Sequence, residues 1–241
     1  SSEAQFVRPV HWLLFLHGEQ VVPCTLLEAK AGNLTYGHRF HHPAAIEIPS
    51  PADYEELLLD KGQVIASFEA RRERISRQIN RSAAALGASV AEDPALLDEI
   101  TALNEWPMPI TGSFEESFLA VPQEALILTM KKNQKYFPLL DAEGRLQNHF
   151  ITIANIDSPR PELISAGNER VLRPRLADAM FFWEQDARQS LADRLPRLKT
   201  VVFQQKLGNM YEKSMRVAKL AANIAGLIEG DSKLAERAAS L

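Results

Sequence analysis

The sequence predicts an α+β fold, in which a mixed region of strands and helices precedes an all-helical region. Short apolar runs separated by turn residues, typical of strands, recur through the first 160 residues, and a long amphipathic helical pattern interrupts them. From Pro161 onward the pattern is almost wholly helical. The composition changes near residues 190–200, so we expect a mixed domain over residues 1–197 and the start of a helical domain over residues 198–241.

The first strands are expected within the opening 50 residues. Two apolar runs, residues 10–17 and 20–27, flank a short turn that contains Gly18, which is the pattern of a β-hairpin. Pro23 has no backbone N–H, so it would place the second run at a sheet edge or a bulge. Further short strands are expected at residues 34–40 and 45–48.

Two helices are expected next. The longer one covers residues 64–86, and Gly87 suits its C-terminal end because glycine adopts a positive φ without strain. Its apolar stripe consists of Phe68, Ile75, Ile79, Ala83 and Leu86. A shorter helix should run to Glu105, with Asp93 as its N-cap and Pro94 at its first helical position.

The middle of the chain predicts a strand, a helix and a hairpin, at residues 108–114, 122–132 and 136–156. The hairpin is the clearest in the sequence. Its strands, residues 136–140 and 149–156, are joined by the turn at residues 141–144, where Gly144 provides a positive φ.

Two helices are expected in the last third of the chain. Pro174 would be the first residue of one helix, because its missing N–H costs nothing there. Its apolar face consists of Leu176, Ala179, Met180, Trp183 and Ala187. The second helix covers residues 205–228. Its inward residues are Met210, Val217, Leu220, Ala221, Ile224, Leu227 and Ile228.

Composition and charge narrow the class of protein. The 46% of hydrophobic residues suit a globular chain, and no apolar run approaches the roughly 20 residues of a membrane span. The single Cys24 excludes an internal disulfide and fits the cytoplasm. Residues 1–127 carry a net charge of −9 and residues 128–219 one of +6, which indicates an anionic partner for the second half. Because the chain starts with Ser1 and stops in a helical pattern, we expect a piece of a longer protein.

The familiar catalytic signatures do not occur. The sequence contains no glycine-rich nucleotide loop, no GxSxG or HExxH motif and no paired CxxC, so we assign no catalytic residue. The turn with His38, His41 and His42 could bind a metal in principle. However, adjacent histidines on an extended segment point to opposite faces and no nearby pattern completes a tetrahedral set, so we assign no metal and expect a turn packed near an edge.

Two basic segments are candidates for binding an anion. The arginines at positions 71–81 alternate with glutamates, which favours a solvated helix face with local ion pairs. Lys131, Lys132 and Lys135 cluster at a predicted helix end beside Asn133, Gln134 and Tyr136. There they could complement the helix dipole or contact an RNA backbone, and the residues alone do not separate these alternatives.

A third basic segment surrounds Pro174. Arg170 and Arg173 would lie just before the predicted helix, where guanidinium groups are free to bind carboxylates or phosphates. Arg175 could also bind there, although it can pair with Asp178 one turn later. The aromatic run at residues 181–183 that follows is expected to lie in the core rather than to stack on bases.

The order and spacing of several motifs resemble a known family. VRPVHW, GHRF, TMKKNQKYFPLLDAEGRL, FITIANI, GNERVLRPRLADAMFFWEQD and LPRLKTVVFQQKLG resemble the β subunit of the bacterial two-subunit glycyl-tRNA synthetase, from about Phe6 to about Ile228. The resemblance implies that glycine is activated with ATP and Mg²⁺ on the α subunit, while the β subunit serves tRNA recognition and charging. It implies as partners tRNA(Gly), the α subunit and the remaining β-subunit domains, in the cytoplasm, with no membrane.

The resemblance also implies domain types. Residues 1–197 would be similar to the B3/B4 domain of the phenylalanyl-tRNA synthetase β chain, and residues 198–241 would begin a helical HD-type domain. We assign no cofactor to this chain, which should not aminoacylate alone. The tRNA-facing residues would be Lys131, Lys132, Lys135, Arg170, Arg173 and Arg175. Two alternatives stay open, namely an editing aminoacyl-tRNA deacylase and a purely structural bridge.

Overall fold

The computed structural model describes residues 10–241 and confirms a mixed helical and sheet fold. The start of the VRPVHW motif lies outside the described residues. The chain divides into two compact units, one ending at Ala179 and the other comprising Met180–Leu241. The boundary expected between residues 197 and 198 separates two types of domain rather than two compact units, and it stays a prediction.

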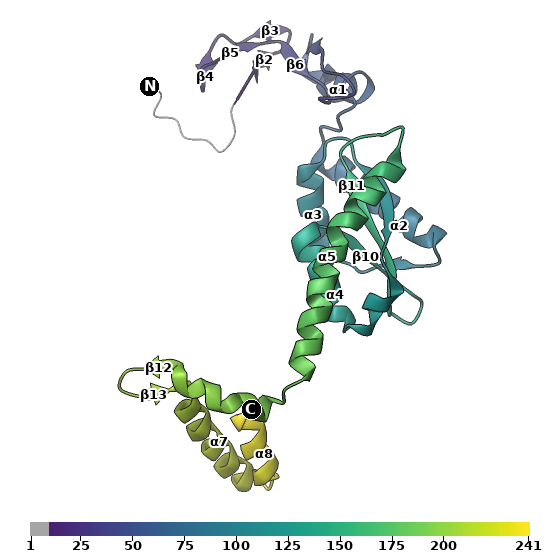
Figure 1. The fold of residues 1–241 in the computed structure, drawn as a ribbon. Helices are drawn as coiled ribbons and strands as arrows, with labels where there is room; N and C mark the ends of the chain where they lie inside the picture. Colours follow the sequence, from purple (N-terminus) through teal and green to yellow (C-terminus); the bar gives the residue numbers. More distant parts are fainter. Residues whose placement is uncertain (1–9) are drawn as a thin grey trace. The chain divides into compact units, whose positions relative to one another are not determined.

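Short strands fill the first part of unit 1 (Figure 1). β2 (Leu16–His17) and β3 (Gln20–Val21) form an antiparallel pair around Gly18, so the predicted hairpin is confirmed in a shorter form. The remaining strands pair as β1–β5, β4–β5 and β6–β7, with bounds β1 (Leu13–Leu14), β4 (Thr25–Leu26), β5 (Ala29–Gly32), β6 (Leu34–Tyr36) and β7 (Ala45–Glu47). A small core forms where Ile46 and Ile48 meet Leu58 of α1 (Tyr54–Asp60), which follows the short 3-10 helix η1 (Pro51–Asp53).

A four-stranded antiparallel sheet is the centre of unit 1. Its strand order is β8-β10-β11-β9, with bounds β8 (Ser89–Val90), β10 (Phe137–Leu140), β11 (Leu146–Ala154) and β9 (Met108–Ser113). β10 and β11 form the predicted hairpin, in which Gly144 has a φ of +77°. The predicted strand before Phe114 is β9, at the sheet edge.

Two helices pack against this sheet through one shared core. The core combines Ile75, Ile79 and Ala83 of α2, Leu96 and Ile100 of α3, and Phe137, Leu139, Ile151 and Ile153 of the strands. α2 (Phe68–Ala85) begins four residues later than predicted, because Ser67 caps it and accepts a hydrogen bond from the Ala70 N–H. α3 (Pro94–Leu103) begins as predicted, with the Asp93 carboxylate accepting from the Leu96 N–H.

The helix predicted at residues 122–132 is present but changes its winding. After the 3-10 segment η2 (Glu116–Ala120), α4 (Gln123–Leu128) continues directly into the π-helical segment η3 (Thr129–Gln134). The segment ends at Lys135, which adopts a left-handed conformation with a φ of +60°. Sequence periodicity does not detect such a short change of winding, which occurs often at functional sites.

The prediction that Pro174 starts a helix was wrong. One helix, α5 (Pro161–Ala187), runs through it. A proline inside a helix leaves the carbonyl four residues earlier, here that of Arg170, without its N–H partner. Both Pro174 and Arg170 are exposed, so water can satisfy that carbonyl, and the proline is tolerated.

Unit 2 is helical apart from one small hairpin. After α6 (Leu191–Arg194) and the 3-10 segment η4 (Leu195–Thr200), β12 (Val202–Gln204) pairs with β13 (Gly208–Asn209), and this hairpin replaces the predicted helix start at residue 205. α7 (Met210–Leu227) begins with a capping box between Asn209 and Glu212, and α8 (Ser232–Ser240) follows. Among residues 10–241, no helix has both the length and the apolar character required to cross a membrane.

Most of the core residues predicted for the last third of the chain are not buried. Trp183 is 48% exposed, and large aliphatic residues of α7 such as Leu220 and Ile224 are 59% and 50% exposed. The residues that α7 does bury are Ala218 and Ala225. Amphipathic spacing identified the apolar side of α7 but not what covers it.

Candidate nucleic-acid interface

Of the three predicted lysines, Lys131 and Lys132 lie in η3 and Lys135 ends it, and together with residues of α3 they line one groove. The Nζ of Lys131 is 3.3 Å from the Asp93 carboxylate, and the Nζ of Lys135 is 2.8 Å from the Glu99 carboxylate. Lys132 is exposed, and no carboxylate of residues 10–241 lies within 4.0 Å of it. The three side chains line one groove of about 530 Å³. The structure therefore brings this cluster together.

The charges in this lysine groove balance. Three carboxylates, those of Asp93, Glu99 and Glu124, line it together with the lysines and with apolar residues such as Ile127. The pKa of Asp93 is lowered, chiefly by the Leu96 N–H at the helix start and then by Lys131. The ion pair of Lys135 and Glu99 is exposed, and such pairs stabilise a protein by only about 0–1 kcal/mol, so Lys135 could exchange its carboxylate for a phosphate at low cost. Lys131 is half-buried and also donates to the Glu92 carbonyl.

The three predicted arginines all lie inside α5, whereas Arg170 and Arg173 were expected before the helix. Nε of Arg173 is 2.5 Å from the Glu115 carboxylate, whose pKa is lowered first by its own backbone N–H and then by Arg173. Arg170 and Arg175 are exposed and have no ion-pair partner within residues 10–241. The anticipated pair between Arg175 and Asp178 does not form in this described part.

Helical geometry separates these arginines into two groups. At 100° per residue, Arg170 and Arg173 lie roughly 60° apart on one side of α5. Arg175 lies roughly 200° from Arg173, beyond the face through which Leu172 and Leu176 are buried. We therefore expect Arg170 and Arg173 to act together and Arg175 to address a different surface.

A hydrogen bond that the sequence did not reveal connects the lysine and arginine segments. The hydroxyl of Tyr136, the residue after Lys135, is 2.7 Å from Oδ1 of Asn168, two residues before Arg170. Burial raises the pKa of Tyr136. The Tyr136 ring stacks on the buried Phe150 with centroids 4.6 Å apart. Tyr136 and Asn168 are 32 positions apart in the sequence, so no local sequence pattern predicts their contact. The contact joins two basic segments within unit 1.

The arginines of α2 were predicted to form local ion pairs on a solvated face; Arg77 does so, whereas Arg72 and Arg74 contact residues outside the helix. Arg72 pairs with Asp98 and Arg77 with Glu73, while Arg74 lies over the Trp106 ring, 4.6 Å from its centroid. Arg71 differs from the prediction of a solvated face, because its guanidinium donates to the carbonyls of Ile65 and Thr101.

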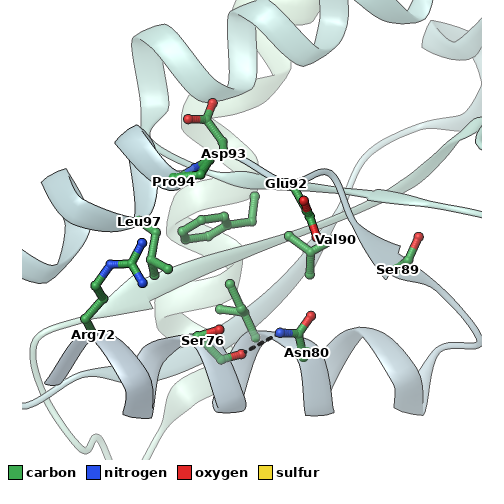
Figure 2. A pocket seen from close by; sticks show the side chains of 11 residues that line it. Arg72, Ser76, Asn80, Ser89, Val90, Glu92, Asp93, Pro94 and Leu97 are labelled. Carbon is green, nitrogen blue, oxygen red and sulfur yellow. Dashed lines mark hydrogen bonds between the residues drawn. The ribbon is translucent and has the colours of Figure 1, made fainter. Parts of the chain in front are cut away.

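A second pocket lies between α2, β8 and α3 (Figure 2). It has a volume of about 400 Å³ and an apolar floor that includes Ile79 and Phe137. Asn80 Nδ2 donates to the carbonyl of Ser76, and Arg72 is held by Asp98. The described lining residues include no histidine or cysteine, so no nucleophile is paired there with an imidazole base.

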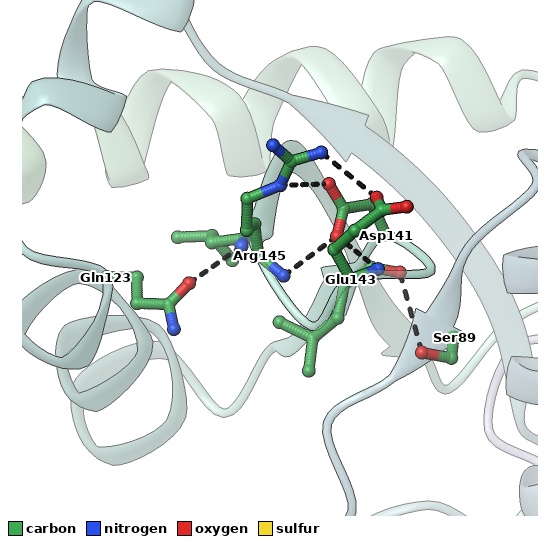
Figure 3. A network of polar contacts seen from close by, with 7 residues as sticks. Ser89, Gln123, Asp141, Glu143 and Arg145 are labelled. Carbon is green, nitrogen blue, oxygen red and sulfur yellow. Dashed lines mark hydrogen bonds and ion pairs between the residues drawn. The ribbon is translucent and has the colours of Figure 1, made fainter.

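In the hairpin of β10 and β11, the Arg145 side chain binds acidic residues of its own turn (Figure 3). The Asp141 carboxylate accepts hydrogen bonds from the backbone N–H groups of Glu143 and Arg145 and from the Arg145 guanidinium. Arg145 also contacts Glu143, 3.0 Å away. These contacts lower the pKa of Asp141, chiefly through the Arg145 N–H. Arg145 thus stabilises the turn.

The histidine cluster binds backbone groups. His38 is 1% exposed, its Nε2 lies 2.7 Å from the Asn155 carbonyl, and its Nδ1 accepts from the N–H groups of Phe40 and His41. His41 Nε2 accepts from the Asp157 N–H. Among residues 10–241, no group of three or more His, Cys, Asp or Glu side chains is arranged to hold a metal ion.

Comparison with known proteins provides a further finding. A family model described as "Glycyl-tRNA synthetase beta subunit" matches residues 1–241. The chain is 52% identical over 241 residues to the glycine–tRNA ligase beta subunit of Hahella chejuensis. It is 54% identical to those of Pseudomonas putida (strain GB-1) and Pseudomonas fluorescens (strain SBW25). Each match covers 100% of this chain and 35% of the relative, so the chain spans about a third of the length of these curated relatives.

Proposed function

This chain belongs to the glycyl-tRNA synthetase β-subunit family, and we propose that it binds and positions tRNA(Gly) and contributes to subunit assembly during ATP-dependent glycylation. In this proposal, ATP, Mg²⁺ and glycine activation belong to an α subunit, and this chain contributes no cofactor and no catalytic residue. The other parts of a β subunit are further partners, and the enzyme works in the cytoplasm.

The observation that carries this proposal is the hydrogen bond between Tyr136 and Asn168. It ties the segment of Lys135 to the side of α5 that carries Asn168. By helical spacing, Arg175 lies roughly 20° from Asn168 around α5, whereas Arg170 and Arg173 lie roughly 140–160° away, on the far side of the same helix. Arginine and lysine side chains at the surface are the usual ligands of nucleic-acid phosphates. Two basic segments held in one unit can therefore contact one RNA backbone without first being ordered.

We extend the proposal to the domain types. Residues 1–197 would correspond to a B3/B4-type domain and residues 198–241 to the start of an HD-type domain. A sheet with α2 and α3 packed on it, and a later part that is helical apart from one small hairpin, are compatible with this assignment. The lysine groove is lined by as many carboxylates as lysines. This balance of charge favours one alternative to tRNA binding, namely a structural bridge to another protein subunit. The pocket of Figure 2 lacks a nucleophile–imidazole pair, so we do not extend the proposal to a deacylase.

Charge reversal tests the proposal. Lys132→Glu and Arg170→Glu change exposed residues without ion-pair partners, so neither breaks a contact that stabilises the fold. In the assembled α and β enzyme, we expect weaker tRNA(Gly) binding and a salt dependence reduced by about 0.9 log units per log unit of salt for each lost phosphate contact. Arg81→Glu is the matched control, since Arg81 is also exposed and unpaired within the described residues.

Two outcomes would contradict tRNA binding. If both variants bind tRNA(Gly) with an unchanged salt dependence, the two side chains do not contact phosphates. If they instead lose the α subunit in size-exclusion chromatography while the free β subunit still binds tRNA, the basic residues serve the structural bridge.

A further inference from the structure

Unit 2 buries almost none of its large apolar side chains. Its buried hydrophobic residues are Ala218 and Ala225, which are 3% and 8% exposed. Its exposed large hydrophobic residues are Phe181, Phe182, Trp183, Leu191, Val201, Val202, Phe203, Leu207, Val217, Leu220, Ile224, Leu227, Ile228, Leu234 and Leu241. Other large apolar side chains, such as Leu198, Met210 and Met215, are half-buried. Fully buried alanines alone remove little apolar surface from water, so the core of this unit is small.

The exposed residues of α7 form one continuous stripe, which we call the α7 stripe. It comprises Val217, Leu220, Ile224 and Leu227, which are 46%, 59%, 50% and 84% exposed. Their spacing of three and four residues places them within roughly a 100° arc of the helix. A helix exposed to solvent on that side would carry polar residues there.

The α7 stripe is distinct from the side of α7 that is already buried. Ala218 and Ala225 lie roughly 120° around the helix from the middle of the stripe. On their side the chain turns back, with the Gly230 N–H donating to the Ala225 carbonyl and Ser232 Oγ donating to that of Ala222. α7 and α8 lie side by side in Figure 1. α7 therefore has two packing sides, one of small residues that is occupied and one of large residues that is not.

We propose that a helix from another part of the same β polypeptide packs on the α7 stripe and completes the core of unit 2. Isolated soluble chains rarely expose continuous apolar patches beyond a few hundred Å². The 241 residues span 35% of the related β subunits, so nearly two thirds of such a chain lies elsewhere and can provide the helix. Elements joined through one chain pack together far more readily than separate proteins, because the connection restricts their separation.

The stripe is also suited to permanent burial. No charged residue belongs to it. By helical spacing, Lys219 lies roughly 120° from its middle, and Arg216, at its edge, donates to the Leu207 carbonyl. Helix-on-helix layers formed by such three-and-four spacing are the usual interior of all-helical domains. The inference rests on family membership and not on tRNA binding.

Cysteine labelling of the full-length β subunit tests the proposal. Val217→Cys and Ile224→Cys place a thiol on the α7 stripe, and Lys219→Cys is the control on the same helix, each in a background without other cysteines. We expect maleimide to modify the two stripe positions at least about tenfold more slowly than position 219, because a buried thiol reacts only when the packed helices open locally. This difference should be present without the α subunit and should not depend on protein concentration.

Three results would overturn the proposal. Equal rates at all three positions would show that the stripe is open in the whole subunit. Slow labelling only after the α subunit is added would assign the stripe to that partner, and protection that grows with β-subunit concentration would assign it to a second copy. Hydrogen exchange of the unmodified subunit provides an independent measurement, in which the amides of α7 should be protected without the α subunit. None of these readings depends on tRNA.

Discussion

Replacing Gly112 by alanine should destabilise unit 1 through a single contact. Gly112 lies in the edge strand β9 directly opposite Phe150 of β11, and the Phe150 ring covers it. An alanine Cβ at this position would collide with Cζ of that ring and lie 2.8 Å from its Cε1. Glycine in a strand interior often marks such a close approach.

The magnitude follows from how little the ring can move. Phe150 is 0% exposed and stacks on Tyr136, so the ring cannot swing toward solvent. Overpacking of this kind costs about 1–3 kcal/mol, and the gain from replacing a strand glycine offsets about 0.5–1 kcal/mol of it. We expect Gly112→Ala to lower the free energy of unfolding by about 1–2 kcal/mol.

A double-mutant cycle separates this contact from general damage to the strand. Phe150→Leu removes the ring, so Gly112→Ala should cost at least about 1 kcal/mol less in that background. Urea unfolding followed by circular dichroism measures all four proteins. Strictly additive costs, or a neutral Gly112→Ala, would refute the reasoning that the ring and the glycine compete for one space.

Three further predictions concern stability. Leu172→Ala removes a fully buried side chain of α5 and should lower the free energy of unfolding in urea by about 3 kcal/mol. Val171→Ala, at a neighbouring residue that is 52% exposed, should lower it by less than about 0.5 kcal/mol, and equal costs would contradict the assignment of Leu172 to the inner face of α5. Asp93→Ala should cost about 1 kcal/mol at pH 7 as a lost N-cap. Folding lowers the pKa of Asp93 below its ordinary value of 3.8, so the stability that its carboxylate contributes is present above pH 3.8 and is lost as the pH falls through the folded-state pKa. If the stability difference between Asp93→Ala and wild type persists below that pKa, the ionised carboxylate is not its cause. His38→Leu removes the partner of three partly buried backbone groups and should cost about 1–3 kcal/mol in thermal unfolding, while the exposed His17→Leu should be nearly neutral. Similar values for the two variants would show that the His38 hydrogen bonds contribute little.

The sequence alone determined the features that depend on neighbouring residues. The turn at residues 141–144 and the start of α3 at Asp93 and Pro94 were predicted and confirmed. The predicted stripe of α2 was confirmed for its middle residues Ile75, Ile79 and Ala83, whereas Phe68 and Leu86 at its ends are 37% and 40% exposed. Each depends on backbone geometry or side-chain spacing within a few residues, and such signals are present in the chain before it folds. The family resemblance was visible in the order of motifs for the same reason, and the family match confirms it.

Only the tertiary structure decided which basic residues are paired and which are free. Lys131 meets a carboxylate 38 positions away and Arg173 meets one 58 positions away, while Lys132 and Arg170 meet none within the described chain. Likewise, Pro174 has the local pattern of a helix start, yet packing of Leu172 and Leu176 carries α5 through it. Contacts between residues distant in sequence depend on how whole elements pack, and no local pattern records that arrangement.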